Sequence, residues 1–378
     1  MEADHDVRER FSELADDLEG RFRAWGVEGK GGWTDAAFET LSLRAFELQH
    51  EGNRLYRRYC DARGIGPGDP ESSREVPPVP TAAFREVDLV VGRPDGVDLV
   101  FRTSGTSRGE GERGRHLVPR PSLYRASLEA TFRRLVLPDG RRPLASLVPP
   151  FDRSEDSSLA WMIDRLLETF GAEGSKWLAD FDGIDWDAAE AFAARAADEG
   201  RPVGLLGTTL AMDAWVRRRK ERGGDAPRLP PGSIVMDTGG AKGRDGLERP
   251  ALLDQIHDVL GVPPADVVNE LGMTELLSQR YGRARTSNPS APVRLRAPPW
   301  LRSRALHPVT LEELPPGEVG VLCHHDLANL GSACAVLTED LGRVVDGELE
   351  WVGRVEGSPP RGCSLATAEL LQARERAS

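Results

Sequence analysis

The sequence contains very little lysine and no long hydrophobic run. Of 49 basic residues, only Lys30, Lys176, Lys220 and Lys242 are lysine, so arginine carries almost all of the positive charge. A lysine inside a motif is therefore of special interest. No segment approaches the roughly 18 to 20 consecutive apolar residues that a membrane-spanning helix needs, which argues against a helical membrane protein.

Cysteine is also scarce, and its four residues lie far apart at Cys60, Cys323, Cys334 and Cys363. They form neither a C-x-x-C pair nor a zinc-ligand spacing, so neither a disulfide framework nor a zinc knuckle is indicated. Cys323 and Cys334 fall in strand-like runs, and we expect both of them to belong to the core.

There is no surplus of positive charge, because the formal net charge is −12. A broad nucleic-acid or membrane surface would usually give a basic balance, so we expect neither kind of partner. The N-terminal segment is acidic and amphipathic, unlike a signal or transit peptide. These features favour a cytoplasmic protein.

The order of the predicted elements is typical of an α/β protein. Helical patterns cover about 6–25, 36–62, 122–137 and 154–171. Strand and helix patterns alternate up to about residue 279, which predicts a mostly parallel sheet with flanking helices. After about residue 290, short strand-like runs with an Asp346–Gly347 turn predict a small antiparallel β region.

We divide the chain accordingly into four segments. These are a helical region over 1–90, an α/β core over 91–290, a small β subdomain over 291–355 and a short tail over 356–378 that carries Cys363.

Three motifs contain groups that suit a nucleotide. TSGTSRG (103–109) offers glycine backbone and hydroxyl donors for phosphate, although it lacks the Walker A spacing. NELGMTE (269–275) is predicted to lead from a strand into a helix, with a hydroxyl and a carboxylate suited to phosphate and Mg²⁺. The third, 337–354, offers a carboxylate that can accept from both ribose hydroxyls. Alone, each also fits a solvated loop, a capped turn or a charged hairpin.

Together, and in this order, the motifs resemble those of the adenylate-forming superfamily of acyl-activating ligases. The closer resemblance is to the acyl-protein synthetases of the LuxE type, with phenylacetate–CoA ligases as cousins. It is carried also by TGGAKGR (238–244), LANLGSACAVLTEDLG (327–342) and GRVEGSPPRGCSLATAELL (353–371). The resemblance implies the adenylate-forming ligase large-domain fold, with ATP and Mg²⁺ as cofactors.

The resemblance also implies roles for individual residues. The residues that would cradle the phosphates are Thr103, Ser104, Gly105, Thr106 and Ser107. Gly239 and Gly240 would lie along the adenine, and Asn269 would contact it. Thr274 would bind the α-phosphate, Glu275 would hold magnesium, Asp340 would bind the ribose, and Arg354 would sit at the hinge that follows.

The sequence departs from the family pattern in three places. Leu271 stands where the family has an aromatic residue. The phosphate loop lacks its usual lysine, and Arg108, Arg113 and Arg115 are the candidates to supply the positive charge instead. The larger ligases carry a mobile C-terminal domain of roughly 100 residues, which we expect to be truncated or absent here. Its catalytic lysine would then be missing. Lys242 is the candidate for the cation that replaces it. The alternative, given equal weight, is that Lys242 is a lysine of a surface loop without a catalytic role.

Cys363 is the candidate acyl acceptor, because the resemblance places an acylated cysteine near the C-terminus. A following helix start and Arg361 are expected to lower its thiol pKa. His116 is a candidate for binding phosphate or orienting the acid; a histidine without such a role is the alternative.

The function that we predict is ATP-dependent activation of a carboxylic acid, expected to be a fatty acid, as acyl-AMP, followed by transfer to Cys363. A reductase or an acyl-carrier protein would be the partner. Two alternatives stay open: an acyl- or aryl–CoA ligase that uses a carrier thiol, and a non-catalytic descendant that binds nucleotide or acyl ligand.

Overall fold

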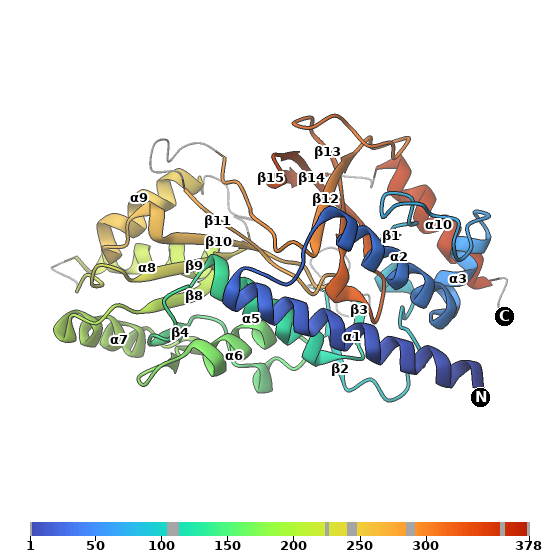
Figure 1. Cartoon of the computed structure of the whole chain (residues 1–378). Helices are drawn as coiled ribbons and strands as arrows, with labels where there is room; N and C mark the ends of the chain where they lie inside the picture. Colours follow the sequence, from blue (N-terminus) through green and yellow to red (C-terminus); the bar gives the residue numbers. More distant parts are fainter. Residues whose placement is uncertain are drawn as a thin grey trace. The chain divides into compact units, whose positions relative to one another are not determined.

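The computed structural model describes residues 2–103, 113–223, 227–239, 248–284, 292–355 and 360–375. The chain forms two compact units. Unit 1 consists of Met1–Arg134, Met273–Gln279 and Ala297–Ser378, and unit 2 of Leu135–Gly272 and Arg280–Arg296. Figure 1 labels most of the helices and strands along the chain. None of the described helices is both long and apolar enough to cross a membrane.

Unit 2 is built on a six-stranded sheet with the order β11-β10-β9-β8-β4-β5. Every neighbouring pair is parallel except β10 and β11. The strands are β4 (Leu144–Ser146), β5 (Lys176–Trp177), β8 (Gly204–Thr208), β9 (Ile234–Thr238), β10 (Val267–Leu271) and β11 (Arg280–Arg283). The prediction of a mostly parallel sheet is therefore confirmed.

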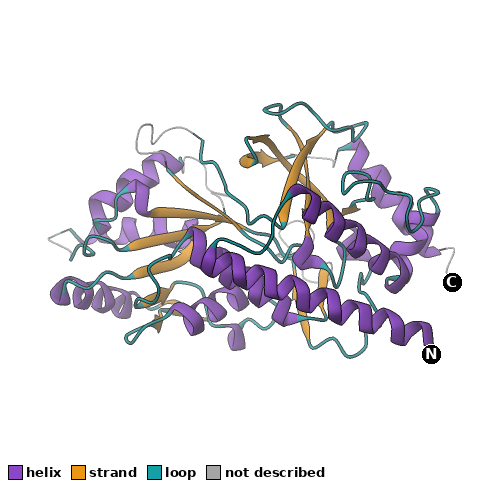
Figure 2. Ribbon diagram, in the orientation of Figure 1, coloured by secondary structure: helices purple, strands orange, loops and turns teal. Residues whose placement is uncertain are grey.

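Four helices accompany this sheet: α6 (Ser158–Phe170), α7 (Trp186–Glu199), α8 (Thr209–Arg222) and α9 (Arg249–Leu260). A small hairpin, β6 (Ala179–Asp180) and β7 (Gly183–Ile184), completes the unit. Apolar side chains of α7, α8 and α9, including Phe192, Trp215 and Ile256, share one buried cluster with those of the strands. Figure 2 shows these helices beside the strands of the sheet. Burial of both sheet faces explains why the central strands are continuous apolar runs.

Unit 1 contains a five-stranded sheet with the order β1-β14-β13-β12, in which β15 also pairs with β14. Only the short β1 runs parallel to its neighbour. The strands are β1 (Val79–Pro80), β12 (Leu301–Leu306), β13 (Gly320–Asp326), β14 (Ala335–Val345) and β15 (Glu348–Arg354), and a separate hairpin pairs β2 (Leu99–Arg102) with β3 (Arg115–Val118).

The predicted antiparallel region and its hairpin turn are confirmed. Asp346 and Gly347 connect β14 to β15 with φ angles of 53° and 78°. Such left-handed angles at both turn residues suit a two-residue hairpin, and glycine adopts them without steric cost.

The helices of unit 1 are α1 (Glu2–Glu28), α2 (Asp35–Gly52), α3 (Arg54–Asp61), α4 (Ala83–Glu86), α5 (Pro121–Leu135, whose last residue falls in unit 2) and α10 (Arg361–Glu375). The helix predicted over 36–62 is in fact two helices. Asn53 separates them, with its backbone extended and its side chain accepting from the Tyr56 amide at 3.1 Å. Asparagine favours this capping position because its side chain replaces a missing helical hydrogen bond.

A helix beginning at Thr274 was also predicted, and this prediction is wrong. Residues 272–279, between β10 and β11, contain a turn at Thr274–Glu275 and a bend at Leu277 but no helix. The Asp326 carboxylate accepts from the Leu277 amide at 3.0 Å and from the Ser278 hydroxyl at 2.7 Å. These side-chain acceptors compete with helical hydrogen bonding in the segment.

We expect Arg219→Ala to destabilise the fold by about 3 kcal/mol, because removing one partner of a buried ion pair leaves the other uncompensated. Arg219 donates to the Glu190 carboxylate at 2.8 Å and to the carbonyls of Pro227 and Val259. Urea unfolding measures the change. The control, Arg222→Ala, removes an exposed pair with Asp187 and should cost less than about 1 kcal/mol. Equal losses in both variants would contradict the expectation.

Candidate functional site

The predicted phosphate loop begins and ends on the hairpin of β2 and β3. The Thr103 amide donates to the Gly114 carbonyl at 2.9 Å, and the Gly114 amide donates to the Thr103 hydroxyl at 2.8 Å. Arg113 donates to the Thr103 carbonyl at 2.7 Å. The ends of the loop are thus closed by hydrogen bonds. Ser104, Gly105, Thr106, Ser107 and Arg108 lie outside the described residues.

His116, on β3, links this hairpin to the second motif. Its Nδ1 lies 2.6 Å from the Thr274 carbonyl, which only a protonated Nδ1 can hydrogen-bond. Burial lowers the pKa of His116 to about 4, so the ring is neutral at ordinary pH. A neutral buried imidazole does not supply positive charge to a phosphate. The hydrogen bond from Nδ1 instead makes His116 a residue that positions the Thr274 backbone.

Glu275 is a buried carboxyl group with a perturbed pKa. Burial raises the pKa of Glu275 to about 7, Asp340 adds to the shift, and the positive charges of Arg354 and Arg85 oppose it. The Asn329 side chain donates to the Glu275 carbonyl at 2.7 Å, which fixes the local backbone. Glu275, Asp340 and the two arginines therefore lie within electrostatic reach of one another in unit 1.

Asp340 and Arg354 face each other across β14 and β15. They are Cα partners in the register, and Arg354 Nε lies 3.3 Å from Asp340 Oδ1. The Asp340 amide donates to the Thr338 hydroxyl at 3.0 Å, and that hydroxyl donates to the Leu322 carbonyl of β13 at 2.9 Å. The sheet therefore holds the predicted ribose-binding carboxylate in a defined position, with one cation beside it.

Cys363 lies near the start of α10 and is only 4% exposed. Its Sγ donates to the Thr338 carbonyl at 3.3 Å, which places the thiol beside the segment of β14 that leads to Asp340. Burial raises the pKa of Cys363 to about 12, and the nearby Glu339 and Cys323 add to this. The expectation of a lowered thiol pKa is therefore wrong, because desolvation exceeds any help from Arg361 and the helix terminus.

A cavity of about 270 Å³ borders this thiol. Its wall includes apolar side chains from β1, β14 and α10, namely Pro80, Leu337, Ala368 and Leu371.

Cys323 and Cys334, like Cys60, are buried free thiols, so the prediction that Cys323 and Cys334 belong to the core is confirmed.

Unit 2 carries the residues predicted to contact adenine. Gly239 follows β9 with a φ of 81°, a conformation that favours glycine. Asn269 lies on β10 opposite Asp237 and donates to the Asp237 carbonyl at 3.3 Å. Gly240 and Lys242 lie outside the described residues.

Two charged residues of these regions were missed from the sequence. Arg249 makes two hydrogen bonds, of 2.7 and 3.0 Å, to the fully buried Asp237 carboxylate at the end of β9. In unit 1, Arg85 contributes its charge to Glu275. Arg85 stands in no recognisable motif, so no signal in the sequence pointed to it. For Arg249 there was a usable signal, because Asp237, the acid after the apolar run IVM, needs a positively charged partner if its strand is buried.

Comparisons with known proteins bear on the family and the fold of the chain. Residues 193–372 match the family model described as acyl-protein synthetase, LuxE. The chain is 24% identical over 344 residues to a long-chain-fatty-acid–luciferin-component ligase of Vibrio harveyi, covering 87% of each chain. The resemblance to the LuxE type is thereby confirmed. The match also confirms the prediction of a ligase.

A second relative and a solved structure extend the comparison. The ligase of the same description from Aliivibrio fischeri is 22% identical over 355 residues, with 88% of each chain covered. The structure of an open 2-hydroxyisobutyryl-CoA ligase with 2-HIB-AMP and CoA matches with a TM-score of 0.61 at 16% identity. This match covers 84% of the present chain and 70% of the other. The predicted adenylate-forming ligase fold is confirmed.

Proposed function

We propose that the protein activates a fatty acid with ATP as acyl-AMP and then transfers the acyl group to its own Cys363. The observation that carries the proposal is the placement of Glu275, Asp340 and Cys363 around β14 of unit 1, in a chain of the LuxE type. The resulting thioester would be passed to a partner protein, a reductase or an acyl carrier.

In the first step a carboxylate oxygen of the acid attacks the α-phosphorus of ATP. The bond from that phosphorus to the bridging oxygen breaks, and pyrophosphate leaves with the electron pair. The protein's task is positioning together with charge stabilisation. Residues 103–107 and Thr274 would bind phosphate oxygens, Asp340 would accept from the ribose hydroxyls, and Gly239, Gly240 and Asn269 would border the adenine.

Glu275 fits the proposed magnesium role by its donor chemistry. Mg²⁺ prefers oxygen ligands and is held by one or two carboxylates together with substrate phosphates. The buried carboxyl has a raised pKa, and a cation beside it would restore the ionised form. When bound, the ion would neutralise charge that develops on the phosphates. Lys242 is proposed as the further cation.

In the second step the Cys363 thiol loses its proton, and the sulfur attacks the acyl carbon of acyl-AMP. The bond between that carbon and the phosphate oxygen breaks, AMP leaves, and a thioester forms. The apolar wall beside the thiol suits the first carbons of an acyl chain. Burial also keeps water away from the thioester until a partner receives the acyl group.

The raised thiol pKa predicts a distinct pH dependence for this step. Because the thiol pKa is about 12, the thiolate fraction grows about tenfold for each pH unit below that value. The rate of acyl transfer, measured in single-turnover quench experiments with preformed acyl-AMP, should therefore rise steadily from pH 7 to pH 9. A plateau near pH 7 would contradict the expectation.

The test of the proposed function is acid-dependent exchange of radioactive pyrophosphate into ATP. A panel of fatty, aromatic and short carboxylic acids should give exchange with at least one chain-length class of fatty acid. If ATP binds and no acid supports exchange, the proposed adenylation is wrong.

One observation favours a second candidate acceptor. Cys363 is buried with a raised pKa, and external carrier thiols such as CoA carry no such penalty. If the protein forms acyl–CoA when CoA is added, and no acylated protein when CoA is left out, the result would support an acyl–CoA ligase.

A further inference from the structure

Unit 1 contains a cavity of about 950 Å³ whose described lining includes none of His116, Glu275, Asp340 and Cys363. It is bordered by α1, α2, α3, α4, the segment 87–94, the start of β3 and the end of α10. Among the described residues, eight arginines and three carboxylates line it: Arg8, Arg54, Arg57, Arg58, Arg85, Arg93, Arg115 and Arg374, with Glu51, Glu86 and Asp88. The whole chain, by contrast, carries a net charge of −12.

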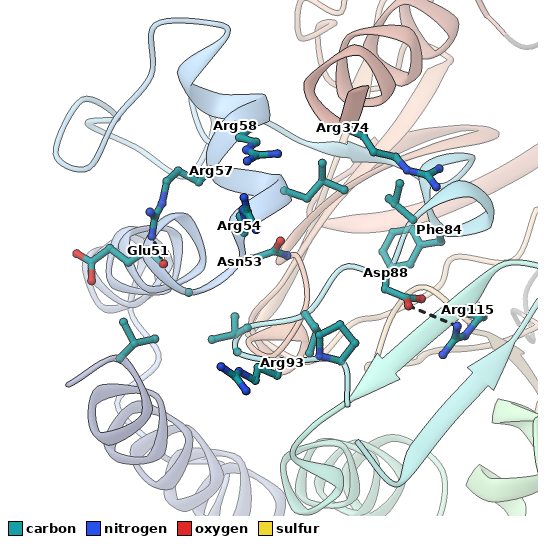
Figure 3. A pocket seen from close by; sticks show the side chains of 18 of the residues that line it. Glu51, Asn53, Arg54, Arg57, Arg58, Phe84, Asp88, Arg93, Arg115 and Arg374 are labelled. Atoms are coloured by element: carbon teal, nitrogen blue, oxygen red, sulfur yellow. Dashed lines mark hydrogen bonds and ion pairs between the residues drawn. The ribbon is translucent and has the colours of Figure 1, made fainter. Parts of the chain in front are cut away.

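Most of this positive charge is not neutralised by the cavity's own carboxylates. Arg115 pairs with Asp88 at 3.4 Å, and Arg374 donates to the Glu86 carbonyl at 2.8 Å. Within the described ranges, the guanidinium groups of Arg54, Arg58 and Arg93 make no side-chain hydrogen bond or ion pair. Figure 3 shows Arg58 extending from α3 toward the side of the cavity that carries Phe84 and Arg374.

We propose that this arginine cavity binds a small ligand carrying two or more phosphate groups. Guanidinium groups bind phosphate oxygens through paired, charge-assisted hydrogen bonds. The volume is within the range of small-molecule and cofactor sites. The arginines converge on a hollow from several segments, an arrangement that suits a compact polyanion better than the convex surface of an acidic protein.

The cavity adjoins the predicted phosphate-loop hairpin through α4. A Cβ added at Gly114 would approach the Phe84 carbonyl at 3.1 Å and Arg85 Cγ at 3.2 Å. Phe84 packs edge-on against His116, with ring centroids 5.6 Å apart. Both Phe84 and Arg85 line the cavity. A bound polyanion would therefore lie against the residues that support Gly114 and His116. The proposal does not rest on the proposed adenylation, because it is argued from the cavity's own arginines; Arg85, whose charge also reaches Glu275, and Arg115 are left unchanged in the test below.

The test is calorimetric titration of the full chain with inorganic tripolyphosphate, and separately with CoA and with ATP. The Arg58→Gln/Arg93→Gln variant should bind tripolyphosphate at least about tenfold more weakly, because two charge-assisted contacts are lost. The matched control, Arg44→Gln/Arg195→Gln, removes the same charge from outside the cavity and should bind like the parent. Thermal melts confirm that both variants fold.

The two additional ligands identify the source of the phosphates. A tenfold loss for CoA as well would assign the cavity to a nucleotide-bearing thiol carrier. A loss for tripolyphosphate and ATP without CoA would assign it to a nucleotide polyphosphate, and a loss for tripolyphosphate alone to an inorganic polyphosphate. Pyrophosphate exchange at saturating ATP should be unchanged in the cavity variant. Equal tripolyphosphate affinity in the cavity and control variants would overturn the proposal. A further titration with polyglutamate tests for an acidic protein as the ligand. A tenfold loss of polyglutamate affinity in the cavity variant, with no loss for tripolyphosphate, would also overturn the proposal.

Discussion

The Cys363→Ser variant is expected to keep fatty-acid-dependent pyrophosphate exchange and to form no acylated protein. Adenylation requires the carboxylate and ATP but no thiol, whereas the thioester requires the sulfur. A serine hydroxyl in the same buried position is a far weaker nucleophile at neutral pH. Intact-mass spectrometry after incubation with ATP, Mg²⁺ and fatty acid measures the acyl group, and the exchange assay measures the first step.

Cys323→Ala is the matched control for this variant. Cys323 is buried in the same apolar cluster as Cys363 but lies on β13 rather than on α10. Its loss should leave acylation in place. Undiminished acylation of Cys363→Ser would mean that another residue accepts the acyl group, and loss of exchange in that variant would mean that Cys363 serves the first step or the fold.

Asp340→Ala is expected to lower fatty-acid-dependent exchange by roughly 10²- to 10⁴-fold. A carboxylate that accepts from both ribose hydroxyls makes two charge-assisted hydrogen bonds, each worth about 1.5–3 kcal/mol. The Thr338 hydroxyl accepts from the Asp340 amide and so fixes the backbone from which this carboxylate projects. Asp340→Asn should fall between the parent and the alanine variant, because the amide keeps one acceptor.

Glu318→Ala is the control for the aspartate. Glu318 is an exposed carboxylate of the same unit and lies outside β14 and β15. Its substitution removes the same charge and should leave exchange within a factor of two. If Asp340→Ala keeps more than a third of the parent's exchange rate at subsaturating ATP, the proposed ribose contact is wrong.

Much of the fold could be predicted because its elements follow simple patterns. The apolar runs GLLGT and IVMDT are the central parallel strands β8 and β9. The Asp346–Gly347 pair forms the turn between β14 and β15, because few other residues tolerate two successive left-handed positions. Each of these signals lies within one short segment of the sequence, so it can be recognised without knowing which distant residues the segment contacts.

The errors arose where a contact distant in sequence decides the outcome. The Asp326 carboxylate accepts from Leu277 and Ser278 and holds the segment after Thr274 in turns, although the local pattern is typical of a helix start. The pKa of Cys363 depends on its burial against β14, which the residues around it do not reveal. The arginine cavity could not be predicted, because its lining comes from seven separate parts of unit 1.

The most direct test of the central claim is the mass of the wild-type chain after incubation with ATP, Mg²⁺ and a fatty acid, without CoA. The account predicts an added acyl mass that hydroxylamine removes and that maps to the peptide containing Cys363. Release of pyrophosphate with no acyl mass on that peptide would contradict it.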